Sequence, residues 1–287
     1  MGILFAFLAL VFWGFGDFLI QKSTRKFGDW VALFYITAFA TVLTFPLIYK
    51  DLLALGSHPR QLGLLVLASV VILFAAILDF EALRKGKISI IEPIFALEIP
   101  VTAVLASLVI GERLTWWQVL FIVLLMVGLA LVSVKSLHVL KKARWERGVW
   151  LAFFATIAMG AVNFLFGEGA RETSPFLFNW FISAFISIVV ILYLFSQSRL
   201  SEIGRDWRLD KKLLLSVAAL DNAAWISYSY SALYIPLAIA TSLSEGFILV
   251  AGLLGLALNK EKLKRHQLLG FILAVVSVIM LAAITDG

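Results

Sequence analysis

The chain has 287 residues, of which 62% are hydrophobic and 15% are charged, and its mean hydropathy is +1.01. Soluble domains are about half apolar and about one quarter charged, so this composition excludes an ordinary globular core and favours a membrane protein. The net charge of +6 comes with 24 Lys and Arg residues that all fall between apolar runs, which indicates membrane topology and not nucleic-acid binding.

The sequence contains no cysteine and only three histidines, His58, His138 and His266, all in polar connections. This excludes disulfides, thiol catalysis and cysteine-ligated metal sites, and it argues against a histidine metal cluster. We therefore expect no metal and no cofactor. The first apolar stretch lacks the basic flank and the cleavage site of a signal peptide, so we expect it to remain as a span.

Ten apolar stretches follow in chain order, each long enough to cross about 30 Å of hydrocarbon as a helix. They lie at residues 3–20, 30–49, 62–80, 88–110, 115–134, 148–167, 176–195, 213–230, 236–258 and 267–284. Within a bilayer such runs satisfy their backbone groups as helices. The longest connections are 135–147 and 196–212, so no soluble domain is inserted. The sequence predicts an all-α integral membrane protein with ten transmembrane helices.

Three short motifs recur in the same order in the two halves of the chain. WGFGDFLI at 13–20 aligns with MGAVNFLF at 159–166 at an offset of 146, which pairs Asp17 with Asn163. The Ala-Leu pair at 82–83 matches that at 232–233 at an offset of 150. GERLTWWQ at 111–118 matches KEKLKRHQ at 260–267 at an offset of 149. The nearly constant offset indicates a duplication of five spans.

The duplication divides the chain into a first five-helix repeat at 1–134, a basic connecting loop at 135–147 and a second five-helix repeat at 148–287. Because five is an odd number, the second copy must enter the membrane with the opposite orientation. Inverted repeats are typical of secondary transporters, whose substrate site lies near the bilayer midplane between the repeats. We therefore expect two inverted five-helix repeats and a carrier function.

The motifs of both halves resemble a known family. WGFGDFLIQKS in the first span, the Ala-Leu that ends the third, the Glu-Pro of the fourth and IGERLTWWQ before the fifth are similar to EamA-type members of the drug/metabolite transporter superfamily. The resemblance covers essentially the whole chain and implies a ten-helix carrier of small organic solutes, often an exporter. The second repeat departs from the pattern, because it reads Asn259-Lys260-Glu261 and lacks the Gly-Glu pair.

The basic residues are unevenly distributed over the connections between spans. The odd-numbered connections hold 20 of the 24 Lys and Arg residues and the even-numbered ones hold 4. The positive-inside rule therefore places the odd connections in the cytoplasm and both termini outside. The family resemblance implies the reverse, with both termini inside, and we follow the charge count for this sequence.

Acids, unlike bases, occur inside the expected spans. Six of the 18 acids do so, namely Asp17, Asp79, Glu92, Glu98, Asp221 and Glu245, and Glu81 and Glu168 directly follow the ends of the third and sixth spans. An acid at mid-bilayer costs about 2.5–3.5 kcal/mol on insertion scales, so it usually faces a cavity or a partner. Without a base in the membrane, these acids either carry a proton or attract cations. Either state suits proton coupling or a cationic substrate group, although Glu81, Glu92 and Glu168 lie near span ends, where headgroup hydration is the alternative.

Helical spacing places Asp17 on one face with Trp13 and Gln21. The repeat counterpart of Asp17, Asn163, is also polar, so we expect both to approach the pseudo-symmetry axis and line the path. The alternative is an interhelical hydrogen bond that only holds helices together.

Glu98 lies near the middle of the fourth span between Pro93 and Pro100, which predict a break in the helix. Broken helices at mid-membrane often coordinate substrate or ions, and Thr102 shares the face of Glu98. The alternative is that proline is simply commoner in membrane helices than in soluble ones.

The eighth and ninth spans complete the predicted path. Asp221, Trp225 and Tyr228 fall on one stripe, which can hold a cation through cation–π contact, the alternative being bundle packing. In the ninth span, Glu245 follows Ser242 by about one turn. The predicted substrate or ion path comprises Trp13, Asp17, Gln21, Asp79, Glu98, Thr102, Asn163, Asp221, Trp225, Tyr228, Ser242 and Glu245.

Two structural roles are expected away from this path. Gly128, Gly270 and Ala274 make the fifth and tenth spans packing surfaces. Glu112 and Glu261 stand just ahead of the same two spans, where each can satisfy exposed N–H groups of the helix that follows, a gating role being the alternative.

The leading hypothesis is a secondary active transporter, an exporter of a small organic metabolite such as an amino acid or an amphiphilic amine. It would work by alternating access between the repeats, coupled to protons or to exchange, within the lipid bilayer of the cell membrane. No P-loop motif is present, so an ATPase is not indicated. The alternatives are a membrane-embedded enzyme acting on a lipid-linked substrate and a channel.

Overall fold

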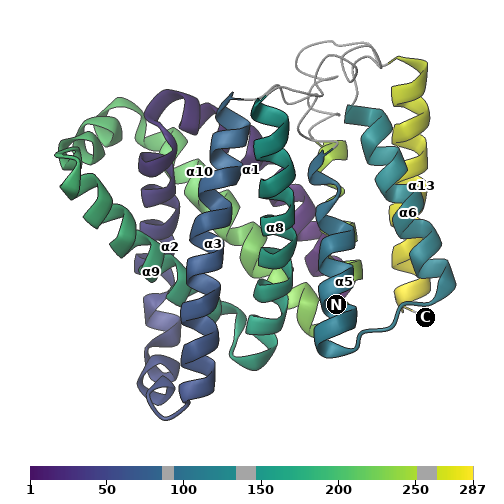
Figure 1. Ribbon diagram of the computed structural model, residues 1–287, viewed down its shortest axis with the longest axis horizontal. Helices are drawn as coiled ribbons and strands as arrows, with labels where there is room; N and C mark the ends of the chain where they lie inside the picture. The colour runs from purple at the N-terminus through teal and green to yellow at the C-terminus, as the bar shows by residue number, and fades with distance from the viewer. Residues whose placement is uncertain (86–93, 134–146, 251–263, 287) are drawn as a thin grey trace.

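The computed structural model describes residues 1–85, 94–133, 147–250 and 264–286, and their regular structure is entirely helical. The helices are α1 Gly2–Phe27, α2 Asp29–Leu55, α3 Pro59–Lys85, α5 Glu98–Ile110, α6 Trp116–Ser133, α8 Arg147–Glu172, α9 Pro175–Ser196, α10 Leu200–Tyr234, α11 Leu237–Ser244 and α13 Arg265–Asp286 (Figure 1). The all-α class that hydropathy predicts is confirmed.

Seven of the described helices are long and apolar enough to cross a membrane: α1, α2, α3, α6, α8, α9 and α13. Two further apolar helices, Glu98–Ile110 and Leu237–Val250, are shorter. They overlap the predicted spans 88–110 and 236–258, and α10 overlaps the predicted span 213–230. The difference between seven long apolar helices and ten predicted spans therefore lies in these three segments.

The helix α10 consists of two pieces joined at Asp210, whose backbone has φ −161° and ψ 66°. The Asp210 Oδ1 atom accepts a hydrogen bond from the Leu213 N–H at 3.1 Å, so Asp210 caps the second piece where the predicted span begins. Residues 200–209, predicted to be part of a connection, are helical instead. They are held against α2, because the Tyr35 hydroxyl donates to the Ile203 carbonyl at 2.6 Å and the Tyr35 ring stacks on Trp207.

The long helices of the two halves of the chain are interleaved. The helix α1 lies along α10, α3 along α8, α2 along α9 and α6 along α13. Figure 1 shows α6 and α13 side by side at one edge of the molecule. A Cβ at Gly128 would lie only 2.7 Å from the Ala274 backbone nitrogen and 2.8 Å from the Gly270 carbonyl oxygen. The prediction that these small residues form a packing surface is confirmed.

Close contacts between helices recur at nearly the offset that relates the sequence motifs. A Cβ at Gly14 would lie 2.6 Å from the Val250 Cβ atom, and a Cβ at Gly160 would lie 2.5 Å from the Val101 Cβ atom. In both places the absent side chain lets α1 or α8 approach a broken apolar helix.

Turns interrupt the two broken apolar helices at positions 149 residues apart. Residues 96–97 form a turn before α5, closed by a 3.0 Å hydrogen bond from the Leu97 N–H to the carbonyl three residues earlier. Residues 245–246 form a turn after α11, closed in the same way by the Gly246 N–H at 3.2 Å.

The predicted break around Glu98 therefore falls at residues 96–97. Pro100 lies in the first turn of α5, where a backbone N–H has no partner within the helix, so the proline costs α5 no hydrogen bond. Pro93 lies outside the described residues.

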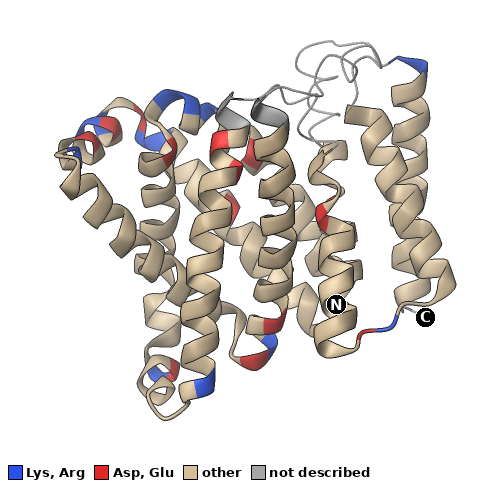
Figure 2. Ribbon diagram, viewed as in Figure 1, with Lys and Arg blue, Asp and Glu red and all other residues tan. Residues whose placement is uncertain are grey.

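Charged groups gather at the two ends of the bundle. Figure 2 shows Lys and Arg concentrated at the end opposite the two termini, where α1 ends and α10 begins. Acidic residues also appear between these ends, on the helices that surround the middle of the molecule (Figure 2).

Candidate functional site

A cavity lies in the middle of the bundle between the two halves of the chain. Its lining comes from α1, α2, α3 and α5 of the first half, from α8, α9 and α10 of the second, and from the turn after α11. Its volume is about 120 Å³, comparable to engineered cavities of about 150 Å³ that bind benzene. The central cavity, as we call it, is therefore large enough for a single-ring body.

Eight of the twelve predicted path residues line the central cavity: Trp13, Asp17, Asp79, Glu98, Asn163, Asp221, Trp225 and Glu245. Five of these are acids, and they come from α1, α3, α5, α10 and the turn after α11. Interleaving brings them together, because α1 lies along α10 and α3 along α8.

Glu98 and Glu245 occupy the two helix breaks. Glu98 is the first residue of α5, and its Oε2 atom accepts a 3.1 Å hydrogen bond from the Asn163 side-chain amide. Glu245 ends α11, its side chain is 4% exposed, and its Oε2 atom has no hydrogen-bond partner among the described residues. The two carboxylates are close enough to repel each other when both are ionised. A bound cation or a proton would relieve this repulsion.

Aromatic rings cover one side of the cavity. The rings of Trp13 and Trp225 meet edge to face with centroids 4.9 Å apart, and Phe166 stacks on Trp225 at 4.1 Å. Phe247 lies 6.5 Å from Trp13. These rings present both apolar faces and π-electron density to the space beside the acids.

Four predicted path residues do not line the central cavity. Ser242 donates to the Ala238 carbonyl at 2.6 Å, and Gln21 is buried near the basic end of α1. Thr102 and Tyr228 instead join helices. The Thr102 hydroxyl donates to the Gly160 carbonyl at 2.9 Å.

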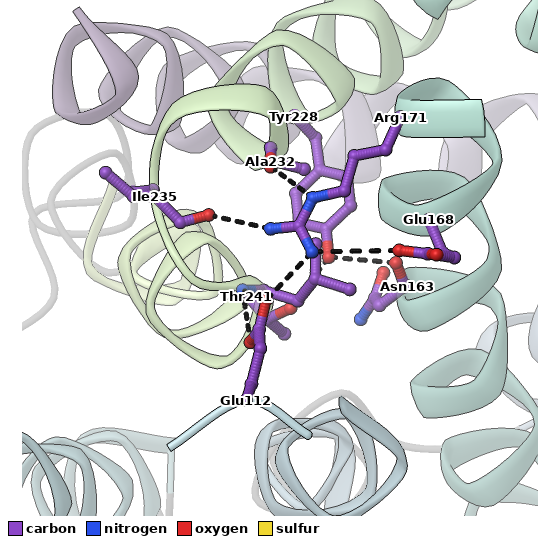
Figure 3. Close-up of polar contacts among 9 residues, drawn as sticks. Glu112, Asn163, Glu168, Arg171, Tyr228, Ala232, Ile235 and Thr241 are labelled. Carbon is purple, nitrogen blue, oxygen red and sulfur yellow. Dashed lines mark hydrogen bonds and ion pairs between the residues drawn. The ribbon is translucent and has the colours of Figure 1, made fainter. Parts of the chain in front are cut away.

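Tyr228 connects three elements around the cavity (Figure 3). Its hydroxyl donates to the Asn163 carbonyl at 2.9 Å and lies 2.8 Å from the Thr241 hydroxyl. It therefore ties α10 to α8 and α11, directly behind the amide that holds Glu98.

Uncharged polar residues that sequence reasoning missed also line the cavity. Asn179 donates to Asn222 at 3.1 Å, and Asn222 donates to the Ile36 carbonyl at 2.9 Å. Thr37, which lines the cavity, accepts a 2.8 Å hydrogen bond from Ser187. The sequence did offer a signal for Asn179 and Asn222, because each is an asparagine inside an apolar run and a buried amide needs hydrogen-bond partners.

A second polar group, the Arg171 cluster, lies where α8 and α10 end and α11 begins (Figure 3). Arg171 donates to Glu112 at 2.9 Å and to the carbonyls of Ala232 at 2.8 Å and Ile235 at 3.2 Å, and its Nη1 atom lies 3.7 Å from Glu168. Glu112 in turn accepts from the Leu237 N–H with both oxygens, at 2.8 and 3.1 Å.

Glu112 therefore caps α11, which belongs to the other half of the chain. The prediction that it caps the helix following it, α6, is wrong. Thr115 and Gln118 already cap α6 reciprocally, with hydrogen bonds of 2.9 and 3.3 Å, so Glu112 is left for the distant helix start. Glu261, its sequence counterpart, lies outside the described residues.

In the described part of the chain, no three His, Asp or Glu side chains are placed so that they could hold a metal ion. The polar groups of the cavity are carboxyls, amides and hydroxyls, which can bind protons, cations and hydrogen-bond donors.

Comparisons with known proteins agree with this architecture. The model of the EamA-like transporter family matches residues 1–134 and 146–283. The uncharacterized protein MJ1333.1 of Methanocaldococcus jannaschii is 28% identical over 136 residues, which cover 47% of this chain and 97% of that protein. One solved crystal structure has a TM-score of 0.72 over 99% of this chain and 98% of its own. At 14% identity, this last likeness shows the fold alone.

Proposed function

Because the chain belongs to the EamA-like transporter family, we propose that it is a secondary active transporter that exports a small organic metabolite, such as an amino acid or an amphiphilic amine. The observation that carries the proposal is the central cavity, which both halves of the chain line with acids and aromatic rings. Substrate sites of secondary transporters lie between two repeats in this way.

We also propose ten membrane crossings arranged as two inverted repeats, at 1–134 and 148–287. Corresponding contacts support it: α1 lies along α10 as α3 lies along α8, and the helix breaks fall 149 residues apart. Thr37 and Ser187, 150 residues apart, form a hydrogen bond between α2 and α9. Equivalent positions that touch each other are expected at a pseudo-twofold axis.

The transport cycle follows from this arrangement. The halves rock about the cavity so that it opens to one side of the membrane at a time. The acids at the helix breaks bind either a proton or the cationic group of the substrate. As access alternates, the proton displaces the substrate and the substrate displaces the proton. Coupling to protons or to exchange thus uses the repulsion between Glu98 and Glu245.

The end of the bundle that carries most Lys and Arg faces the cytoplasm in this proposal, and both termini face outward. Alkaline phosphatase fused after Gly287 is active only outside the cytoplasm, so an active fusion is expected. A cytoplasmic reporter that is active at the same position would reverse the assignment.

Transport is tested on the full chain reconstituted in liposomes. Labelled amines and amino acids are offered with and without a pH gradient, and saturable counterflow is expected. Asp221→Asn should reduce it strongly, whereas Asp51→Asn, which changes an exposed acid at the end of α2, should not. Flux that stays linear with concentration indicates a channel, and no protein-dependent flux of any solute contradicts the proposal.

A further inference from the structure

We infer that the central cavity selects an organic cation with a single-ring apolar body and rejects solutes that carry a carboxylate. An aromatic amine would then be transported in preference to the amino acid with the same ring. This inference rests on the proposed transport function and narrows its substrate class.

The first observation is the charge of the lining. Five acids line the cavity: Asp17, Asp79, Glu98, Asp221 and Glu245. No Lys, Arg or His is among the described residues that line it. An ammonium group thus meets several potential counter-ions, whereas a carboxylate meets no basic side chain among the described lining residues and is repelled by the acids.

A helix N-terminus is the usual substitute for a basic residue in binding a carboxylate, and α5 begins at the cavity. Its first residue is Glu98, so an acid already stands at that positive end. Asn163, the nearby amide donor, is engaged by the same carboxyl group at 3.1 Å. The start of α5 and the Asn163 amide are therefore both occupied by Glu98.

Glu245 supplies the complementary feature, a carboxyl group with one oxygen that lacks a donor among the described residues. Its side chain is 96% buried, lines the cavity, and its Oε2 atom has no hydrogen-bond partner among the described residues. Buried polar atoms normally have partners, so an unpaired one at a cavity points to a ligand. An ammonium group, with up to three N–H donors, fits this acceptor.

Arg171, a basic residue of α8, lies outside the lining of the cavity. Glu112 and the carbonyls of Ala232 and Ile235 already accept its hydrogen bonds. Asn163 of α8 lines the cavity, and its carbonyl accepts a hydrogen bond from Tyr228 of α10. The hydrogen bonds of Arg171 are therefore made within the Arg171 cluster and not to a solute in the central cavity.

The aromatic rings define the body of the solute. Trp13, Trp225 and Phe247 surround the space next to the acids, and a π-face attracts a cation as well as an apolar ring. A volume of about 120 Å³ suits one ring and not a large polycyclic drug.

The test compares 2-phenylethylamine with phenylalanine, which differ only in the carboxylate. In proteoliposomes of the full chain, each unlabelled compound competes with labelled 2-phenylethylamine in counterflow at neutral pH. We expect half-inhibition by the amine at a concentration about tenfold or more below that of the amino acid, because the carboxylate lacks a partner. N-acetylated 2-phenylethylamine, which has the ring without the charge, should also compete poorly.

Glu245→Gln should weaken the preference for the amine, and Glu172→Gln, which changes an exposed acid at the end of α8, should leave it unchanged.

A second measurement does not depend on transport by the variants: the amine should raise the Tm of the wild-type protein in detergent, and phenylalanine should not. Equal or stronger competition by phenylalanine overturns the inference but leaves a carrier. Saturable transport of other solutes that the amine does not inhibit also overturns the inference and leaves a carrier. If no solute is transported in a saturable way, the proposed function itself is overturned.

Discussion

The central cavity and the Arg171 cluster both contain carboxyl groups, but among the described residues only the cluster contains a base. In the cluster, Arg171 and Glu112 bond to each other and to backbone groups at the ends of α10 and α11. In the cavity, acids gather without a base among the described lining residues, and Glu245 leaves an oxygen unpaired. Paired charges at a helix end hold elements in place, whereas an unpaired carboxyl oxygen beside a cavity, as in Glu245, points to a ligand.

The two regions are also connected. Asn163 holds Glu98 with its side chain and accepts from Tyr228 with its carbonyl, and Tyr228 contacts Thr241 on α11. The N-terminus of α11 is in turn capped by Glu112 of the cluster. A movement of α11 during transport would therefore change contacts in both the cavity and the Arg171 cluster. Substitutions in each region can separate the role of the cavity from that of the cluster.

The largest effect is expected in the cavity. Glu98→Gln keeps the shape of the side chain but removes its charge and its ability to exchange a proton, so transport should fall by about tenfold or more. The Tm should stay within about 2 °C of the wild type or rise, because one source of repulsion disappears. Liposome uptake and thermal unfolding measure the two quantities. Wild-type transport by this variant would remove Glu98 from the path.

The Arg171 cluster should respond in the opposite way, through stability. Arg171→Ala removes the side-chain donor to two backbone carbonyls and the cationic partner of Glu112, which keeps the Leu237 N–H, and this should cost about 1–3 kcal/mol of unfolding free energy. The loss is smaller than for a fully buried pair, because the Arg171 side chain is 28% exposed. Unfolding in mixed micelles measures it, with Arg113→Ala, an exposed arginine of the neighbouring turn, as control. A change as small as that of the control would show that the cluster contributes nothing to folding.

Removing only the charge of Glu112 should have a smaller effect. Glu112→Gln keeps one oxygen that can accept from the Leu237 N–H, but it weakens the interaction with Arg171 and with the positive end of α11. We expect a loss of about 1 kcal/mol by the same unfolding assay. If Glu112→Gln instead lost as much unfolding free energy as Arg171→Ala, the charge of Glu112 and not its capping of α11 would account for the stability that the cluster contributes.

The smallest effect is expected at the exposed pair between Lys26 and Asp210, 2.8 Å apart at the basic end. The Lys26 ammonium and the Leu213 N–H lower the pKa of Asp210 below its usual value of 3.8. A lowered pKa means that the pair stabilises the fold above about pH 4 and that this stabilisation is lost as the pH falls through the folded-state value. Asp210→Asn keeps the cap, so its Tm should lie slightly below that of the wild type at pH 7, and the difference should disappear as the pH falls through the lowered pKa of Asp210. A Tm difference between Asp210→Asn and the wild type that does not change with pH would contradict a stabilising ion pair between Lys26 and Asp210.

Hydropathy and spacing predicted much of the architecture, because a bilayer requires long apolar helices and a helical period brings Asp17 and Trp13, or Asp221 and Trp225, to one face. Tertiary partners could not be predicted in this way. Glu112 has its sequence neighbours at α6 but its hydrogen-bond partners at Leu237 and Arg171, on helices more than fifty residues away. Hydropathy alone likewise could not show that Tyr35 holds residues 200–209 as a helix.

Hydroxyl groups explain why part of the predicted path is absent from the cavity lining. A serine or threonine in a helix can donate to a carbonyl of the preceding turn, as Ser242 does, and then needs no cavity. The presence of a hydroxyl residue on a polar stripe therefore predicts little, whereas an ionised carboxyl has no hydrogen to donate to such a carbonyl. The acids of the stripes line the cavity, and Thr102 and Ser242 do not.

The interleaving of the two halves has a consequence for biosynthesis. The first half leaves the ribosome before α8 and α10, against which α3 and α1 pack, have been made. Until then Asp17, Asp79 and Glu98 reside in the membrane without the helices that later enclose them. The nascent chain must be sheltered by the insertion machinery or by water until the second half arrives, and a synthesis pause before α8 should increase its degradation.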